Sequence, residues 1–163
     1  MRQFVSVCCL VMLMVCCLAA ETPAQPPTTS GGSGQALLNL DNTVAAHGYD
    51  VVAYFNQKRA RRGNKRIKER LGMATYYFAS SRNRYQFLSD APKYQPQFGG
   101  YCAMSMAMGR LEDIDPLAYA IYQDKLYLFR DKNAKEAFFK DPDLAISQAT
   151  ENYFKIARER RAY

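Results

Sequence analysis

The sequence predicts a small single domain of the α+β class, built from β-hairpins and packed helices. Two pairs of short apolar or aromatic segments are joined by turn residues, as in hairpins: 67–71 with 74–78, and 118–122 with 125–129. Segments with helical spacing lie between and after these pairs, without regular βαβ units. This order of elements is typical of an α+β domain.

The N-terminus has the layout of a secretory signal. Arg2 precedes a run from Phe4 to Ala20 that is apolar except for Ser6, and polar residues follow. We expect cleavage near residue 20, which would give a secreted or periplasmic protein with no transmembrane segment after cleavage. The alternative is an uncleaved N-terminal anchor.

Composition then divides the rest of the chain. Residues 21–36 are rich in Pro, Ser, Thr and Gly and predict a flexible linker. A domain is expected over 37–157, followed by a basic tail over 158–163. About 140 mature residues suit one domain with a modest core.

The first predicted helix covers residues 51–55. Gly48-Tyr49-Asp50 forms a turn, and Asp50 is placed to cap the helix. After a basic stretch, Gly72 supplies the turn of the first hairpin, whose second strand is aromatic and β-prone.

Three further helices and a strand complete the expected elements. Ser80 or Ser81 caps a helix that Pro92 closes. The alternating stretch 102–108 fits an extended strand, and two helices are expected between Asn133 and Arg160. The apolar residues of these three helices are Tyr85, Phe87 and Leu88 in the first, Ala134, Ala137 and Phe138 in the second, and Leu144, Ile146, Ala149, Tyr153 and Ile156 in the third.

Four blocks of the sequence, in order, resemble the exported YHS-domain proteins of bacteria. The blocks are Gly48-Tyr49-Asp50-Val51-Val52-Ala53-Tyr54-Phe55, the segment 76–87 with Asn83 and Phe87, the segment 92–103 with Gly99-Gly100-Tyr101-Cys102-Ala103, and Asp124-Lys125-Leu126-Tyr127-Leu128. The resemblance spans roughly residues 45–155, and its motif residues are Gly48, Tyr49, Asp50, Gly99, Gly100 and Tyr101. It implies a YHS-like fold. Related modules hold a metal with several cysteines, whereas this chain has Ala79, Ser80 and Ser81 at the corresponding places.

Cysteine usage directs attention to one thiol. Four of the five cysteines lie in the predicted signal, so Cys102 would be alone in the mature protein and no internal disulfide is expected. A lone thiol in an oxidising compartment is either buried in the core or serves metal, redox or intermolecular chemistry.

The strongest chemical hypothesis is a soft-metal site for Cu(I) formed by Cys102, Met104 and His47. Thiolate and thioether sulfurs are soft ligands, and His47 is the sole histidine. On an extended strand, sulfurs two residues apart begin about 6.5–7 Å from one another. The four sulfur residues of 102–108 therefore could not all bind one ion, and core packing is the alternative.

A thiol enzyme would need Cys102 beside His47, with an acid such as Asp50 orienting the imidazole. No accepted catalytic signature surrounds Cys102, and the chain has no phosphate-binding loop, nucleophile elbow or dinucleotide fingerprint. The sequence therefore favours a binding protein over an enzyme.

The charge of the chain is concentrated between residues 58 and 70. Eight Lys and Arg residues lie there with Glu69 as the one acid, and Arg61, Arg62 and Arg66 are the candidate contacts. Such a block favours an anionic surface, for example phospholipid headgroups. Nucleic acid is not expected as the partner of an exported protein. The alternative is a solvated basic hairpin that maintains solubility.

Three hypotheses follow, in order of preference. The first is an exported YHS-type binding module for a soft metal or small ligand, centred on Cys102. The second is a structural or interaction domain with a buried, inert Cys102 and a basic hairpin facing an anionic surface. The third is a thiol-dependent enzyme.

Overall fold

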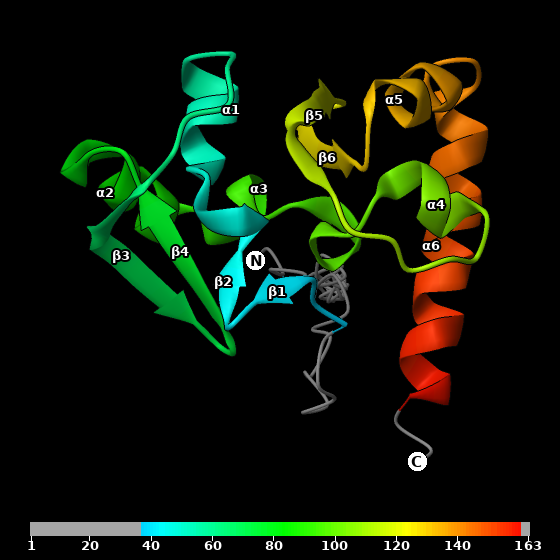
Figure 1. Cartoon of the computed structure of the whole chain (residues 1–163), viewed down its shortest axis with the longest axis horizontal. Coiled ribbons are helices and arrows are strands. Elements are labelled where there is room, and N and C mark those ends of the chain that lie inside the picture. Colours follow the sequence, from blue (N-terminus) through cyan, green and yellow to red (C-terminus); the bar gives the residue numbers. More distant parts are fainter. Residues whose placement is uncertain (1–36, 161–163) are drawn as a thin grey trace, which may run out of the picture. The chain divides into compact units, whose positions relative to one another are not determined.

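Two β-sheets and the helices packed on them make up residues 37–160, the part of the chain that this computed structural model describes (Figure 1). One sheet has the strand order β1-β2-β4-β3, and the other is the β5-β6 hairpin. This arrangement confirms the predicted α+β class. The predicted signal peptide, the linker and the last three residues of the predicted tail lie outside the described residues.

The four-stranded sheet contains the first predicted hairpin. Its strands are β1 (Leu40–Asp41), β2 (Val44–Ala45), β3 (Asn64–Leu71) and β4 (Ala74–Phe78). β3 and β4 are antiparallel, with Glu69 opposite Tyr76, and Gly72 adopts φ +59° in their turn. β3 pairs with β4 alone and is thus an edge strand of the sheet.

Helix α1 (Val51–Asn56) and helix α2 (Ser81–Ser89) flank this hairpin, and Asp50 and Ser80 cap them as predicted. Alternate residues of β4 are buried, as the period of a strand requires when one face packs on a core. The Phe87 ring of α2 lies 4.7 Å from the Tyr76 ring and 5.2 Å from the Phe78 ring.

Two details of α2 differ from prediction. Its buried residues are Asn83 and Phe87, one turn apart, whereas Tyr85 and Leu88 are 73% and 51% exposed. Pro92 does not close α2, because Asp90 ends that helix and caps the next, α3 (Ala91–Tyr94). Proline is well accommodated in the first turn of a helix, where its missing N–H has no partner to lose.

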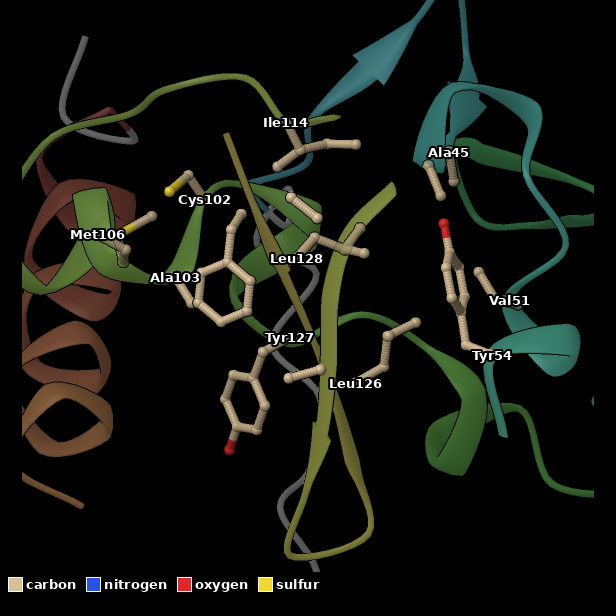
Figure 2. Packing of buried hydrophobic residues seen from close by; sticks show 14 of the residues in the cluster. Ala45, Val51, Tyr54, Cys102, Ala103, Met106, Ile114, Leu126, Tyr127 and Leu128 are labelled. Atoms are coloured by element: carbon tan, nitrogen blue, oxygen red, sulfur yellow. The ribbon is translucent and has the colours of Figure 1, made fainter. Parts of the chain in front are cut away.

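The second hairpin forms as predicted from β5 (Asp115–Tyr122) and β6 (Lys125–Phe129), and the two C-terminal helices are α5 (Lys132–Phe138) and α6 (Pro142–Glu159). All four residues from Leu126 to Phe129 are buried. Figure 2 shows why: Cys102 and Met106 lie on one side of β6, and Val51 and Tyr54 lie on the other. The core is therefore shared between the two sheets.

The stretch 102–108 is a helix, α4 (Ala103–Ala107), and not the expected strand. Its alternation of sulfur-containing and small residues is compatible with either a strand or a helix. The stretch lacks the β-branched and aromatic residues that favour strands, whereas alanine and methionine favour helices. α4 packs mainly on α6, where the Asn152 amide donates to the Met106 and Ala107 carbonyls. Local propensity and the α6 contact explain the helix.

Candidate functional site

Cys102 is fully buried at the N-terminal end of α4. Its backbone N–H donates to the Glu112 carbonyl at 3.0 Å, and its backbone lies in a parallel bridge with Leu128 of β6. The side chain lies in the hydrophobic core near Met106 and Ile114 (Figure 2). These surroundings are apolar.

The helical structure of 102–108 rearranges the sulfur residues. Residues four apart share a helix face, so Cys102 and Met106 are both fully buried, whereas Met104 is partly buried and Met108 is 49% exposed. The predicted Cys102 and Met104 pair therefore does not share a face.

His47 engages an acidic partner instead of a sulfur. Its Nε2 lies 2.7 Å from Asp113 Oδ1, and that oxygen also accepts from the Asn39 amide and the Ile114 N–H, both at 2.8 Å. Partial burial opposes ionisation of Asp113, but the hydrogen bonds from Asn39, Ile114 and His47 prevail and lower its pKa. Between residues 37 and 160, no three His, Cys, Asp or Glu side chains are grouped as metal ligands.

The predicted motif residue Asp50 lies at the centre of a buried polar cluster. Its Oδ1 accepts from the Val52 and Ala53 N–H groups, and its Oδ2 accepts from the Ala79 N–H and the Asn83 amide, both at 2.7 Å. One carboxylate therefore joins the start of α1, the end of β4 and α2. This is a structural role, and Asp50 does not contact His47.

The glycine motif holds a close approach of two backbone segments. In η2 (Gln97–Gly100), Gly99 has φ +63°, and a Cβ there would lie 1.8 Å from the Leu37 carbonyl oxygen. The next residues continue this contact, since Tyr101 donates its hydroxyl to the Leu38 carbonyl. Gly48 also has a positive φ, +77°, and a Cβ there would lie 3.1 Å from the Tyr77 ring, a less severe contact than at Gly99.

The basic segment is the feature of greatest exposure and charge. All eight of its Lys and Arg side chains are exposed, and none forms an ion pair with an acidic side chain of residues 37–160. The one acid, Glu69, is paired with Arg84 of α2 at 2.6 Å. Arg62 lies over the Tyr49 ring at 5.2 Å.

The two faces of β3 differ. Ile67 and Glu69 are half-buried, and Glu69 pairs with Arg84 of α2, whereas Arg66, Lys68 and Arg70 are exposed. Because side chains alternate along a strand, Lys68 and Arg70 share one face where β3 pairs regularly with β4; Arg66 lies where the register shifts. The β-strand period therefore separates these two cations from the packed side.

A hollow beside this strand brings predicted residues together in a way that the sequence did not indicate. Its volume is about 410 Å³, and it is lined by Asp41, Asn42, Val44, His47, Gly48, Arg62, Gly63, Lys65 and Tyr77. His47 and Gly48 thus meet Arg62 of the basic segment at one place. The backbone before His47 has positive φ angles at Asn42, Thr43 and Ala46, as does His47 itself, and nothing in the sequence of these non-glycine residues indicates this conformation.

Comparisons were made with protein-family models, with curated proteins and with solved structures. None of the three finds a match. The site is therefore interpreted from its own geometry. In the described part of the chain, every helix is too short or too polar to cross a membrane.

Proposed function

We propose that this chain is an exported, non-catalytic binding module of the YHS type, which docks on an anionic phospholipid surface through residues 58–70. The supporting observation is that the whole net charge of the protein resides in this segment. The chain has 22 Lys and Arg and 15 Asp and Glu; the segment holds eight and one, which leaves 14 of each elsewhere. Because the charges of the remaining residues sum to zero, an anionic surface should be attracted mainly to this segment.

The geometry of the edge supports docking, in addition to its charge. Edge strands often carry lysine or arginine to prevent unwanted pairing, and a few charges would suffice for that purpose. Here the cations continue from the loop before β3 to Arg70, near the end of the strand. Arg62 and Lys65 also line the hollow next to His47. Arginine can donate two parallel hydrogen bonds to a phosphate group, so a headgroup fits this edge well.

The alternative, a Cu(I) site at Cys102, has less support. Cys102 is enclosed in the apolar core, His47 pairs with Asp113, and Met104 is only partly buried, unlike Cys102 and Met106. A buried, inert thiol and a basic docking edge are the second of the three hypotheses drawn from the sequence, and the geometry favours this combination.

The test is co-sedimentation of residues 21–163 with vesicles of 30 mol% phosphatidylserine in phosphatidylcholine. Each basic residue near such a surface contributes about 1 kcal/mol, so reversing Arg61, Arg62 and Arg66 to Glu should weaken binding roughly 100-fold or more. Raising the salt to 1 M should also release the protein, because the Debye length falls to about 3 Å.

A matched control keeps the net charge of the variant but moves the substitutions. Lys125, Lys140 and Lys155 are exposed and lie outside the segment, and their change to Glu should weaken binding far less. Equal losses in the two triple variants would reduce docking to a general charge effect. Binding that is insensitive to salt and to both triple substitutions would contradict the proposal.

A further inference from the structure

A second, larger cleft lies between α1 and the β5-β6 hairpin and is separate from the hollow at the basic edge. Its volume is about 640 Å³, within the range of small-molecule sites. The walls are formed by α1, Lys58 shortly beyond it, α3, β5, the β5-β6 turn and the α5 region. None of the predicted site residues lies in it.

Apolar and aromatic residues make up six of the eleven that line the cleft. The apolar and aromatic lining residues are Tyr54, Phe55, Tyr119, Ala120, Ile121 and Phe139. The Tyr54 and Tyr119 rings lie 4.5 Å apart, and the Tyr54 hydroxyl donates to the Pro116 carbonyl at 2.9 Å, which fixes this wall. Ile121 and Phe139 are 36% and 44% exposed and so offer apolar surface to a ligand in the cleft.

Three lysines and one aspartate give the cleft an excess of positive charge. Lys93 is paired with Asp124 at 3.4 Å. Lys135 instead lies over the Tyr119 ring at 5.6 Å, and Lys58 has no ion pair within residues 37–160. Two ammonium groups therefore remain without a carboxylate at the rim of an apolar cleft.

The position of Lys58 has a conformational cost. It has φ +49°, just after the C-terminal end of α1, where glycine is the usual residue. A non-glycine residue adopts this region only at a conformational cost. Lys58 nevertheless occupies this position, and its place just beyond α1 makes it part of the cleft lining.

We propose that this cleft binds a small amphipathic anion, an aromatic or other apolar body with one carboxylate or phosphate group, and that Lys58 and Lys135 contact the anionic group. The apolar walls account for the body, and the two unpaired ammonium groups account for the charge. This site is distinct from the docking edge, although Lys58 belongs to both regions.

The experiment titrates residues 21–163 with three probes of one shape, 2-naphthoate, 2-naphthyl phosphate and the neutral naphthalene-2-carboxamide, and follows backbone amide shifts by NMR. The anions should bind saturably at the cleft with a Kd on the order of 0.1–1 mM, as expected for ligands of this size. The tighter of the two anions identifies the headgroup. The carboxamide should bind at least about fivefold more weakly, since it offers no charge to the lysines.

Two variants distinguish the contribution of the lysine charge to binding from that of the apolar wall. Lys135→Glu should weaken both anions roughly tenfold and leave the carboxamide unchanged, whereas Phe139→Ala should weaken all three probes roughly fivefold. Lys155→Glu, exposed on α6 and outside the cleft, is the control of equal charge and should change nothing.

The proposal is overturned if no probe shifts the cleft amides saturably up to about 10 mM, well above the expected Kd. It is also overturned if the carboxamide binds as tightly as the anions, or if Lys135→Glu has no more effect than Lys155→Glu. Because Lys135 lies outside residues 58–70, the same variant should retain vesicle binding. The two proposals can therefore fail independently.

Discussion

Substitution of Asp50 by Asn is expected to be the most destabilising change of similar size in this domain. The fully buried carboxylate accepts four hydrogen bonds, two on each oxygen. An amide has one oxygen, so its NH₂ group must face either the Val52 and Ala53 N–H groups or the Ala79 N–H and the Asn83 amide. Two buried donors then lose their acceptor.

The expected magnitude follows from those two bonds. A hydrogen bond to a charged group contributes about 1.5–3 kcal/mol, so Asp50→Asn should cost roughly 3–6 kcal/mol of the free energy of unfolding. Domains of this size have about 5–15 kcal/mol in total, and each kcal/mol lowers the Tm by roughly 4 °C. Urea and thermal unfolding followed by circular dichroism should show a Tm roughly 12–24 °C lower.

Asp141 provides the matched control. It caps α6 through one hydrogen bond to the Leu144 N–H and is exposed, and Asn caps helices as well as Asp does. Asp141→Asn should therefore change stability by less than about 0.5 kcal/mol. If Asp50→Asn also cost less than about 1 kcal/mol, the argument that this carboxylate joins three elements would be wrong.

Three further outcomes are expected. Gly99→Ala should destabilise the domain well beyond Gly72→Ala, because both positions have positive φ but only Gly99 lacks room for a Cβ; equal losses of unfolding free energy would refute the steric argument. Iodoacetamide should alkylate Cys102 only at the rate of domain opening, and Cu(I) competition titration should show no tight binding; rapid alkylation, or one-to-one binding lost in Cys102→Ser, would restore the metal hypothesis. The hydrogen bond from the Ser105 hydroxyl, followed by the interactions with Arg130 and Arg110, holds the pKa of Glu112 below its ordinary value of 4.5. The ionised Glu112 therefore contributes fully to the free energy of unfolding above pH 4.5, and this contribution is lost as the pH falls through the lower pKa of the folded state. Glu112→Gln should flatten this acid dependence of the urea midpoint, and an unchanged dependence would contradict it.

Much of the fold could be predicted because local rules and tertiary structure agree. Asp50 as a cap, Gly72 in a turn and the Gln123-Asp124 turn all follow from residue chemistry at short range. The stretch 102–108 was misread because its period of two suited a strand, and the sequence did not indicate that α6 would cover it. Tertiary contacts decided that case.

The candidate site was less predictable, since it depends on segments far apart in the sequence. The exposure and clustering of residues 58–70 could be read from the sequence directly. The pairing of His47 with Asp113, 66 residues away, could not, and neither could the cleft shared by Lys58 and Lys135. The charge density of a segment depends on residues that are neighbours in the sequence, whereas a cavity depends on which distant segments the fold brings together.

The confinement of the net charge to one edge also affects how the protein behaves in a column or an electric field. Its isoelectric point near 9.2 is set by thirteen residues, and the remaining surface is balanced overall. On a cation exchanger the molecule should therefore adsorb in one orientation, with β3 against the resin and the α5 region available to solutes. A resin coated in this way would present the same face of every molecule.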